Sequence, residues 1–99
     1  MNKINATLNG CTFFKITDEE WQTIEEGTIL MLERDLENPY DGCAVKILHH
    51  DKQIAWVPKP ENQEISRAID HKDSVDCIVT RVFGTPRDRP HIEADFIQK

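Results

Sequence analysis

Residues 32–47 read LERDLENPYDGCAVKI, and they carry the clearest structural signal in the chain. Apolar, β-prone runs at residues 28–33 and 43–48 predict two strands. The first run is apolar on both faces, which is typical of a central strand. Between the runs, Asn38-Pro39-Tyr40-Asp41-Gly42 concentrates turn formers, because proline fixes φ and Asn and Asp side chains accept hydrogen bonds from the local backbone. We therefore expect a structured turn between two strands.

Further strands and two short helices are predicted on either side of this segment. Residues 4–9 alternate between apolar and polar, residues 12–16 are β-prone, and residues 53–57 pair back on 43–48 as a hairpin. Thr17-x-x-Glu20 matches a capping box and predicts a helix over residues 18–25. Residues 61–70 carry one apolar stripe at helical spacing, which predicts a second helix.

The last part of the chain predicts two more strands, joined by a loop at residues 85–90. In the strand at 74–83, one side holds Val75, Cys77 and Val79, and the other holds Ile78 and Val82. Residues 92–96 alternate again and form a closing strand. Short strands of this kind with two short helices indicate a mainly β (α+β) fold, a small barrel or curled sheet, in a single domain over residues 1–99.

The chain is acidic, since 12 Lys and Arg stand against 18 Asp and Glu and give a formal net charge of −6. Taken alone, this charge argues against a polyanionic partner, because phosphate affinity depends on cationic side chains. The acids are unevenly distributed, however. A cluster of them falls in the first third of the chain: Asp18, Glu19, Glu20, Glu25, Glu26 and Glu33. A neutral or mildly basic groove elsewhere is therefore compatible with the composition.

The sequence predicts a cytoplasmic protein with no membrane partner. We find neither the apolar stretch of a secretory signal nor a run long enough to span a bilayer. The three cysteines, Cys11, Cys43 and Cys77, lie more than thirty residues apart and lack C-x-x-C spacing. This distribution fits reduced thiols that are buried or half-buried as small apolar side chains.

Common catalytic and cofactor motifs are missing from the sequence. It contains no G-x-x-x-x-G-K-[ST] or G-x-G-x-x-G loop for nucleotide phosphates and no G-x-S-x-G nucleophile. The histidines lack zinc-site spacing, and we interpret His49 and His50, in the predicted hairpin turn, as solvated surface. We therefore expect no metal, no cofactor and no enzyme activity.

Four segments together resemble the HIRAN domain family. Residues 32–47 are similar to its hallmark, a hydrophobic strand that leads to an Asn-Pro-Tyr-Asp turn and a small-aliphatic strand. Gly10-Cys11-Thr12-Phe13-Phe14 resembles its Gly-x-x-aromatic-aromatic segment. Ile54-Ala55-Trp56-Val57-Pro58-Lys59 resembles its Gly-aromatic-Ile/Val-Pro-basic segment, and Val82-Phe83-Gly84 its late aromatic-Gly step. The segments follow the family's order and spacing from about residue 4 to residue 97.

The resemblance implies an OB-like β-barrel of about six strands that binds nucleic acid. The family is best known as an accessory domain of DNA-remodelling ATPases, including the helicase-like transcription factor, in which it captures the 3′-hydroxyl end of single-stranded DNA. Carried over to this sequence, Tyr40 and Phe13 stack on the terminal bases, and Asp41 accepts a hydrogen bond from the 3′-hydroxyl. Asn38 holds the turn or contacts the terminal nucleotide, Lys59 meets a phosphate and Phe83 closes the pocket.

The sequence departs from the family pattern at three positions. Thr12 stands where DNA-binding members often carry arginine, so one phosphate or base contact is lost. Phe13 replaces a tyrosine, which keeps the stacking face but removes the hydroxyl. Ala55 replaces a glycine before Trp56.

Each site residue also has a structural interpretation. Tyr40 and Asp41 fit a packed turn tyrosine and an Asx-type cap, Phe13 and Phe83 fit core aromatics, and Lys59 fits a solvated lysine. Arg34 is better interpreted as a hydrogen-bond donor to the turn than as a phosphate ligand. Arg87 and Arg89, interrupted by Asp88, fit a plain surface loop.

The resemblance and the residue patterns leave two possible functions open. The first is a nucleic-acid-binding module for single-stranded DNA 3′ ends, without catalysis of its own. The second is a protein-interaction or adaptor domain with the same fold that serves a separate DNA repair or defence enzyme, such as a helicase or nuclease subunit.

Overall fold

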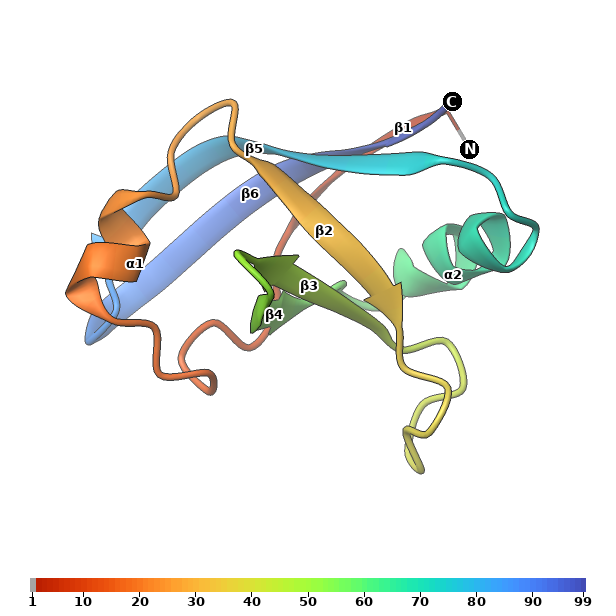
Figure 1. Cartoon of the computed structure of the whole chain (residues 1–99), viewed down its shortest axis with the longest axis horizontal. Helices are drawn as coiled ribbons and strands as arrows, with labels where there is room; N and C mark the ends of the chain where they lie inside the picture. Colours follow the sequence, from red (N-terminus) through yellow and green to blue (C-terminus); the bar gives the residue numbers. More distant parts are fainter. Residues whose placement is uncertain (1) are drawn as a thin grey trace.

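The computed structural model describes residues 2–99. Its strands are β1 (Lys3–Thr7), β2 (Ile29–Arg34), β3 (Val45–His49), β4 (Lys52–Trp56), β5 (Val75–Thr85) and β6 (Asp88–Gln98), and its helices are α1 (Asp18–Gln22) and α2 (Asn62–Asp70). The strands form one six-stranded antiparallel sheet in the order β1-β6-β5-β2-β3-β4 (Figure 1). The predicted mainly β fold with two short helices is confirmed.

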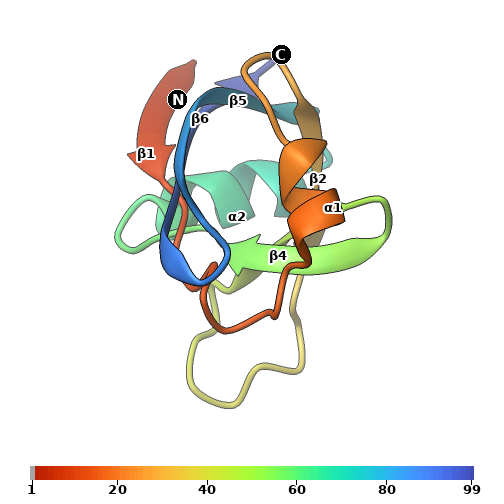
Figure 2. The ribbon, with the colours of Figure 1, turned by 90° about the vertical axis from the view of Figure 1, so that its left-hand side faces the viewer.

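The sheet curls until its two outer strands approach each other. Asn9, just after β1, and Trp56, at the end of β4, exchange two backbone hydrogen bonds of 3.0 and 2.7 Å. Figure 2 shows the chain leaving β1 and passing beside β4. This partial closure gives a curled half-barrel of the OB-like class, and it brings the end of β1 close to the end of β4.

The core fills the inside of the curl. Leu30, Ile47, Val79 and Phe96 come from four different strands and are at most 2% exposed. Ile65 on α2 is fully buried in the same cluster, so α2 packs its apolar stripe against the sheet. Burying each side chain of this size contributes about 1.5–3 kcal/mol to folding. This core fixes the strands and the helix from which the surrounding loops extend.

The predicted capping box is present at the start of α1. Thr17 Oγ1 accepts a hydrogen bond from the Glu20 backbone N–H at 3.1 Å, and the Thr17 backbone N–H donates to Glu20 Oε1 at 2.8 Å. The buried Trp21 donates its indole N–H to Gly84 O at 3.2 Å, which holds α1 on the β5–β6 hairpin. The helix ends at Gln22 rather than at residue 25.

Residues 12–16 do not form the predicted strand, because residues 11–15 form turns. Gly10 has a φ of 82°, and the Phe13 backbone N–H donates to Gly10 O at 2.9 Å. A Cβ atom at Gly10 would stand 3.2 Å from Trp56 Cδ1. Glycine therefore permits the turn and also admits the indole, and this tertiary contact overrides the local β propensity.

The predicted central strand is confirmed, because β2 lies between β5 and β3, but Ile29 and Met31 are each 64% exposed, so β2 is buried on one face only. Two further predictions about the strands are corrected. On β5, the register shifts between Val79 and Arg81, and Val82 packs on the core that contains Val79. An extra residue at such a bulge moves the following side chains to the other face. The loop expected at residues 85–90 is a tight turn, because Thr85 pairs with Asp88.

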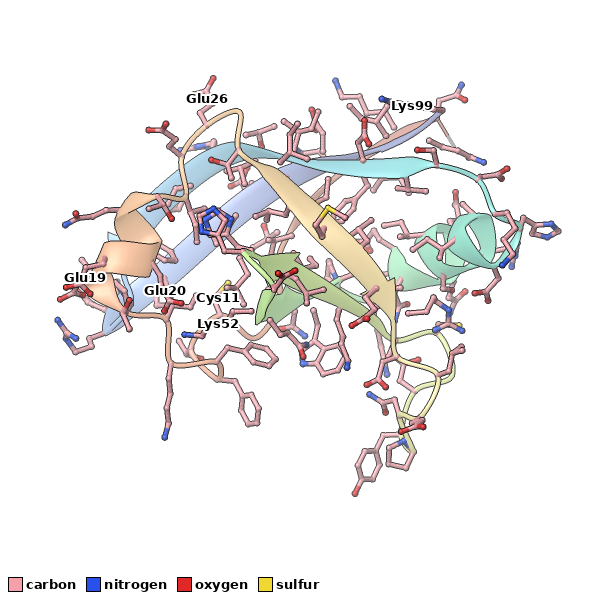
Figure 3. All side chains as sticks on the ribbon, in the orientation of Figure 1. Cys11, Glu19, Glu20, Glu26, Lys52 and Lys99 are labelled. Carbon is pink, nitrogen blue, oxygen red and sulfur yellow. The ribbon has the colours of Figure 1, made fainter. Side chains whose placement is uncertain are left out.

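His49 is not the solvated surface residue that we expected, since it is only 8% exposed. Its Nε2 lies 2.8 Å from Thr23 Oγ1, just after α1, and its ring stacks on exposed His50 at 4.0 Å. Nearby, Lys52 Nζ donates to Glu20 Oε1 at 2.6 Å (Figure 3). These contacts join α1 to the β3–β4 hairpin, so the end of α1 covers His49.

The thiols lie where the sequence predicted. Cys11 and Cys77 are buried and Cys43 is half-buried, and all three are free. Burial raises the pKa of Cys11 to about 11 and that of Cys77 to about 12. Neither helix found in residues 2–99 has the length and apolar character to cross a membrane.

Candidate nucleic-acid interface

The β2–β3 loop (residues 35–44) is ordered by its own side chains. Asn38 Oδ1 accepts hydrogen bonds from the backbone N–H groups of Tyr40 at 2.9 Å and Asp41 at 3.0 Å. Asp41 Oδ1 accepts a third from the Cys43 backbone N–H at 2.9 Å. Each side chain caps the backbone that follows it, as Asn and Asp do in tight turns. The structured turn predicted from the sequence is confirmed.

Arg34, at the end of β2, fixes this loop to the body of the domain. Its guanidinium donates to Ala44 O at 2.7 Å, to Gly42 O at 2.9 Å and to Asp70 Oδ1 on α2 at 3.0 Å. The side chain is only 12% exposed. Because its donors are turned toward the loop carbonyls and Asp70, the interpretation of Arg34 as a structural hydrogen-bond donor is confirmed.

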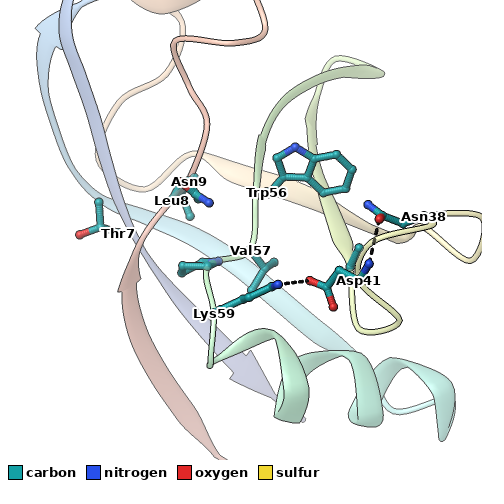
Figure 4. A pocket seen from close by; sticks show the side chains of 10 residues that line it. Thr7, Leu8, Asn9, Asn38, Asp41, Trp56, Val57 and Lys59 are labelled. Atoms are coloured by element: carbon teal, nitrogen blue, oxygen red, sulfur yellow. Dashed lines mark hydrogen bonds and ion pairs between the residues drawn. The ribbon is translucent and has the colours of Figure 1, made fainter.

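An open pocket of about 550 Å³ lies where three segments meet (Figure 4). The segments are the end of β1, the β2–β3 loop, and the end of β4 with the turn that follows it. Their lining residues are Thr7, Leu8, Asn9, Asn38, Asp41, Ala44, Trp56, Val57, Pro58 and Lys59. Of the residues predicted for the site, the pocket therefore brings together Asn38, Asp41 and Lys59.

Asp41 is approached by donors from three different segments. Besides the Cys43 bond to Oδ1, its Oδ2 accepts a hydrogen bond from Asn62 Nδ2 at 2.9 Å and lies 3.6 Å from Lys59 Nζ. The Cys43 N–H, the Lys59 charge and the Asn62 amide together lower the pKa of Asp41, against an opposing effect of burial. The carboxylate is thus ionised at neutral pH and acts only as an acceptor.

Exposed aromatic side chains lie around this region. Tyr40, at the tip of the β2–β3 loop, is 92% exposed, and Phe13 is 77% exposed. Phe13 meets Phe14 edge to face at 5.2 Å, and Phe14 lies 6.1 Å from the ring of Trp56, which lines the pocket. Neither Tyr40 nor Phe13 is a core aromatic. Water-exposed rings of this kind offer stacking surface to bases.

Trp56 is a pocket residue that the sequence analysis did not select. It lies three positions before Lys59 in the segment Trp56-Val57-Pro58-Lys59, which was already compared with the family, so this segment was an available signal. Asn62 was also missed, because a polar residue at the start of a helix carries no signal of which side chain it meets. Its partner, Asp41, is contacted only after the chain has folded.

Phe83 lies on the β5–β6 hairpin and is not among the residues that line the pocket. It is 42% exposed, so it is not a core aromatic. Its ring stacks on His91 at a centroid distance of 4.2 Å, and the Arg81 guanidinium lies 4.7 Å from the same ring. In the sheet, β6 lies between β5, which carries Phe83, and β1, whose end lines the pocket.

The charge around the pocket differs from that of the whole chain. The pocket lining contains one carboxylate, Asp41, and one ammonium, Lys59. Figure 3 shows Glu19 on α1 and Glu26 before the start of β2, both away from the β2–β3 loop. Arg87 pairs with Asp18 at 2.6 Å, so its charge is neutralised at α1. In residues 2–99, no group of three or more His, Cys, Asp or Glu side chains is arranged to hold a metal ion.

The comparisons with known proteins agree with this fold. The HIRAN domain family matches residues 1–98, so the chain belongs to the HIRAN domain family, which is known for nucleic-acid-binding modules. A crystal structure of a protein from Lactobacillus plantarum is similar, with a TM-score of 0.81 and 18% identity over 99% of this chain and 91% of that one. The crystal structure of the HIRAN domain of human HLTF is similar with a TM-score of 0.76 and 17% identity, over 98% of this chain and 74% of that one. No curated protein sequence matches the chain.

Proposed function

We propose that this HIRAN domain captures the 3′-hydroxyl end of single-stranded DNA in the pocket beside the β2–β3 loop. The observation that carries the proposal is the ionised Asp41 carboxylate, held in the pocket with Lys59 3.6 Å away. A terminal 3′-hydroxyl is a hydrogen-bond donor, and an internal phosphodiester linkage has none at that position. A fixed acceptor can therefore distinguish an end from the interior of a strand.

The neighbouring groups suit the rest of a terminal nucleotide. Lys59 has a side chain that is 69% exposed, so it can turn toward the phosphate on the 5′ side of the terminal sugar. Tyr40 and Phe13 present exposed rings on which bases stack at about 1–3 kcal/mol each, regardless of sequence. Asn38 holds the turn that carries Tyr40 and Asp41. Phe83 lies on the β5–β6 hairpin outside the pocket lining, so it can meet only a strand that extends beyond the pocket.

The net charge of −6 shapes the kind of binding that we expect. Lys59 is the one cation in the pocket lining, so few counterions are released on binding. Each phosphate contact contributes about 0.7 to the slope of log affinity against log salt concentration, so the salt dependence should be shallow. Affinity then depends on stacking and on the end hydroxyl, and duplex DNA binds poorly. The domain binds without catalysis of its own.

Fluorescence anisotropy with short oligonucleotides tests the proposal. We expect an oligonucleotide with a 3′-hydroxyl to bind at about 50 mM salt, and the same strand with a 3′-phosphate to bind much more weakly, because Asp41 repels the added charge. Asp41→Ala should remove the difference between the two ends. Glu37→Ala is the control, because Glu37 is an exposed carboxylate in the same loop. Equal binding of both ends by the wild-type domain contradicts the proposal.

A second candidate function is an adaptor that docks on a repair or defence enzyme, such as a helicase or nuclease subunit. The observation that favours it is the exposed apolar face of β2. Ile29 and Met31 are each 64% exposed there, and they pair with half-buried Ile78 on β5 and Leu48 on β3. Two results together would favour this candidate over DNA binding. The folded domain would bind no single strand at about 50 mM salt, and a partner enzyme would bind the wild type but not an Ile29→Glu, Met31→Glu variant.

A further inference from the structure

Asn62, the first residue of α2, is a polar side chain placed in the interior. It is 2% exposed, and its Nδ2 donates to Asp41 Oδ2 at 2.9 Å. Its backbone N–H donates to Pro58 O at 2.9 Å, in the turn that carries Lys59. One residue therefore connects α2 to both segments that supply the charged groups of the pocket. Burying an amide is costly unless it is hydrogen-bonded, and this amide is bonded to a carboxylate from another segment.

We propose that Asn62 is a positioning residue for end recognition: it orients the Asp41 carboxylate so that one oxygen site stays free for a single hydroxyl donor. The inference rests on the proposed function of the pocket. An ionised carboxylate offers about four acceptor sites, two on each oxygen. The Cys43 N–H occupies one site on Oδ1, while Asn62 and Lys59 approach Oδ2. The second site on Oδ1 has no protein donor in residues 2–99, and we assign it to the hydroxyl.

Lys59 cannot perform this orienting role. Its side chain is 69% exposed and its ammonium lies 3.6 Å from Oδ2, which is longer than a good hydrogen bond. When a DNA phosphate attracts Lys59, the ammonium leaves Asp41, and Asn62 is the donor that remains on Oδ2. The amide is neutral, so it holds the carboxylate without attracting phosphate to the position of the hydroxyl.

The test compares two strands that differ by one atom, one ending in a 3′-hydroxyl and one in a 3′-hydrogen. Because a hydrogen bond to a charged group contributes about 1.5–3 kcal/mol, we expect the wild-type domain to prefer the hydroxyl by about tenfold or more. Asn62→Ala should reduce this ratio to about threefold or less. Ser66→Ala is the matched control. Ser66 is 3% exposed on the same helix and its hydroxyl donates to Gln63 O, away from Asp41, so Ser66→Ala should keep the wild-type ratio.

A second variant separates orientation from mere folding. Asn62→Asp keeps the side-chain shape but replaces the donor with a carboxyl group beside Asp41. Near pH 8 both carboxylates are ionised and repel each other, so the preference for the hydroxyl should be lost. Near pH 5 the new carboxyl retains a proton and donates it to Asp41 Oδ2, so the preference should return. A residue that only supports the fold gives no such recovery. Carbon-13 NMR of the DNA-free domain adds a further readout, since the pKa of Asp41 should rise in Asn62→Ala.

The outcomes are distinct. If the wild-type domain binds both strands equally, end recognition itself is wrong, and this inference fails with it. If the wild type prefers the hydroxyl and the folded Asn62→Ala and Asn62→Asp variants keep the full ratio at every pH, end recognition stands and the role of Asn62 is overturned. An unchanged Asp41 pKa in Asn62→Ala also overturns it. Loss of the ratio in Asn62→Ala, its return at low pH in Asn62→Asp, and a raised Asp41 pKa together support the inference.

Discussion

Replacing Arg34 with lysine tests whether the β2–β3 loop is held in place from outside the pocket. The guanidinium donates to two loop carbonyls, Gly42 O and Ala44 O, and to Asp70 on α2. A lysine keeps the charge, but its ammonium lacks the planar fork that reaches these three acceptors at once. We expect two of the bonds to be lost in Arg34→Lys, at about 1–1.5 kcal/mol each, which sums to about 2–3 kcal/mol.

This loss is large for a domain of 99 residues, whose whole free energy of unfolding is about 5–15 kcal/mol. The urea midpoint should fall by about 1–2 M and the melting temperature by about 10–20 °C. The two tryptophans, Trp21 and Trp56, report unfolding by fluorescence. Arg67→Lys, on the exposed side of α2, is the matched control and should behave as wild type. If Arg34→Lys unfolds within about 0.5 kcal/mol of wild type, the assigned role of Arg34 is refuted.

Further predictions concern binding and pH. Tyr40→Ala should weaken binding to all single strands by about 1–3 kcal/mol without changing the preference for a 3′-hydroxyl; a changed preference in anisotropy titrations would place Tyr40 at the end group instead. Lys59→Met should flatten the logarithmic salt dependence of binding by about 0.7, and an unchanged slope would separate Lys59 from the phosphates. Burial lowers the pKa of His49, and the charge of His50 lowers it further, while Glu20 raises it. Below about pH 6.5 the unfolded chain therefore binds a proton at His49 more readily than the folded domain does. The urea midpoint should therefore fall as pH drops through this range, less so in His49→Gln; a fall of the same size in that variant contradicts the assignment.

The parts of the fold that depend on local chemistry could be predicted from the sequence. The capping box at Thr17 and the Asx-type turn at Asn38 involve residues within four positions of each other, and both are present. The exposed loop at Tyr40 and the structural role of Arg34 were also open to prediction, because turn formers and a preceding arginine lie together in the sequence. Local patterns of this kind predicted the two helices and the six strands that form, and also a strand at residues 12–16 that does not form.

The remaining features depend on contacts between segments far apart in the sequence. The turn at Gly10 follows from the approach of Trp56, and the burial of His49 follows from α1 folding over the hairpin. Neither contact is visible in a periodic pattern. The side of β5 on which Val82 lies depends on a bulge, which breaks the alternation on which the prediction rested. Asn62 could not be selected because its function requires Asp41, 21 positions away.

If the domain recognises a strand end, a circular oligonucleotide should not bind in the pocket. A linear strand and its circularised form share sequence, length and nearly all of their phosphates, but the circle has no 3′-hydroxyl. Anisotropy competition at one salt concentration should show the linear strand displacing a labelled 3′-hydroxyl probe while the circle fails at the same concentration. Equal displacement by the circle would contradict end recognition, because binding would then require only the backbone and the bases.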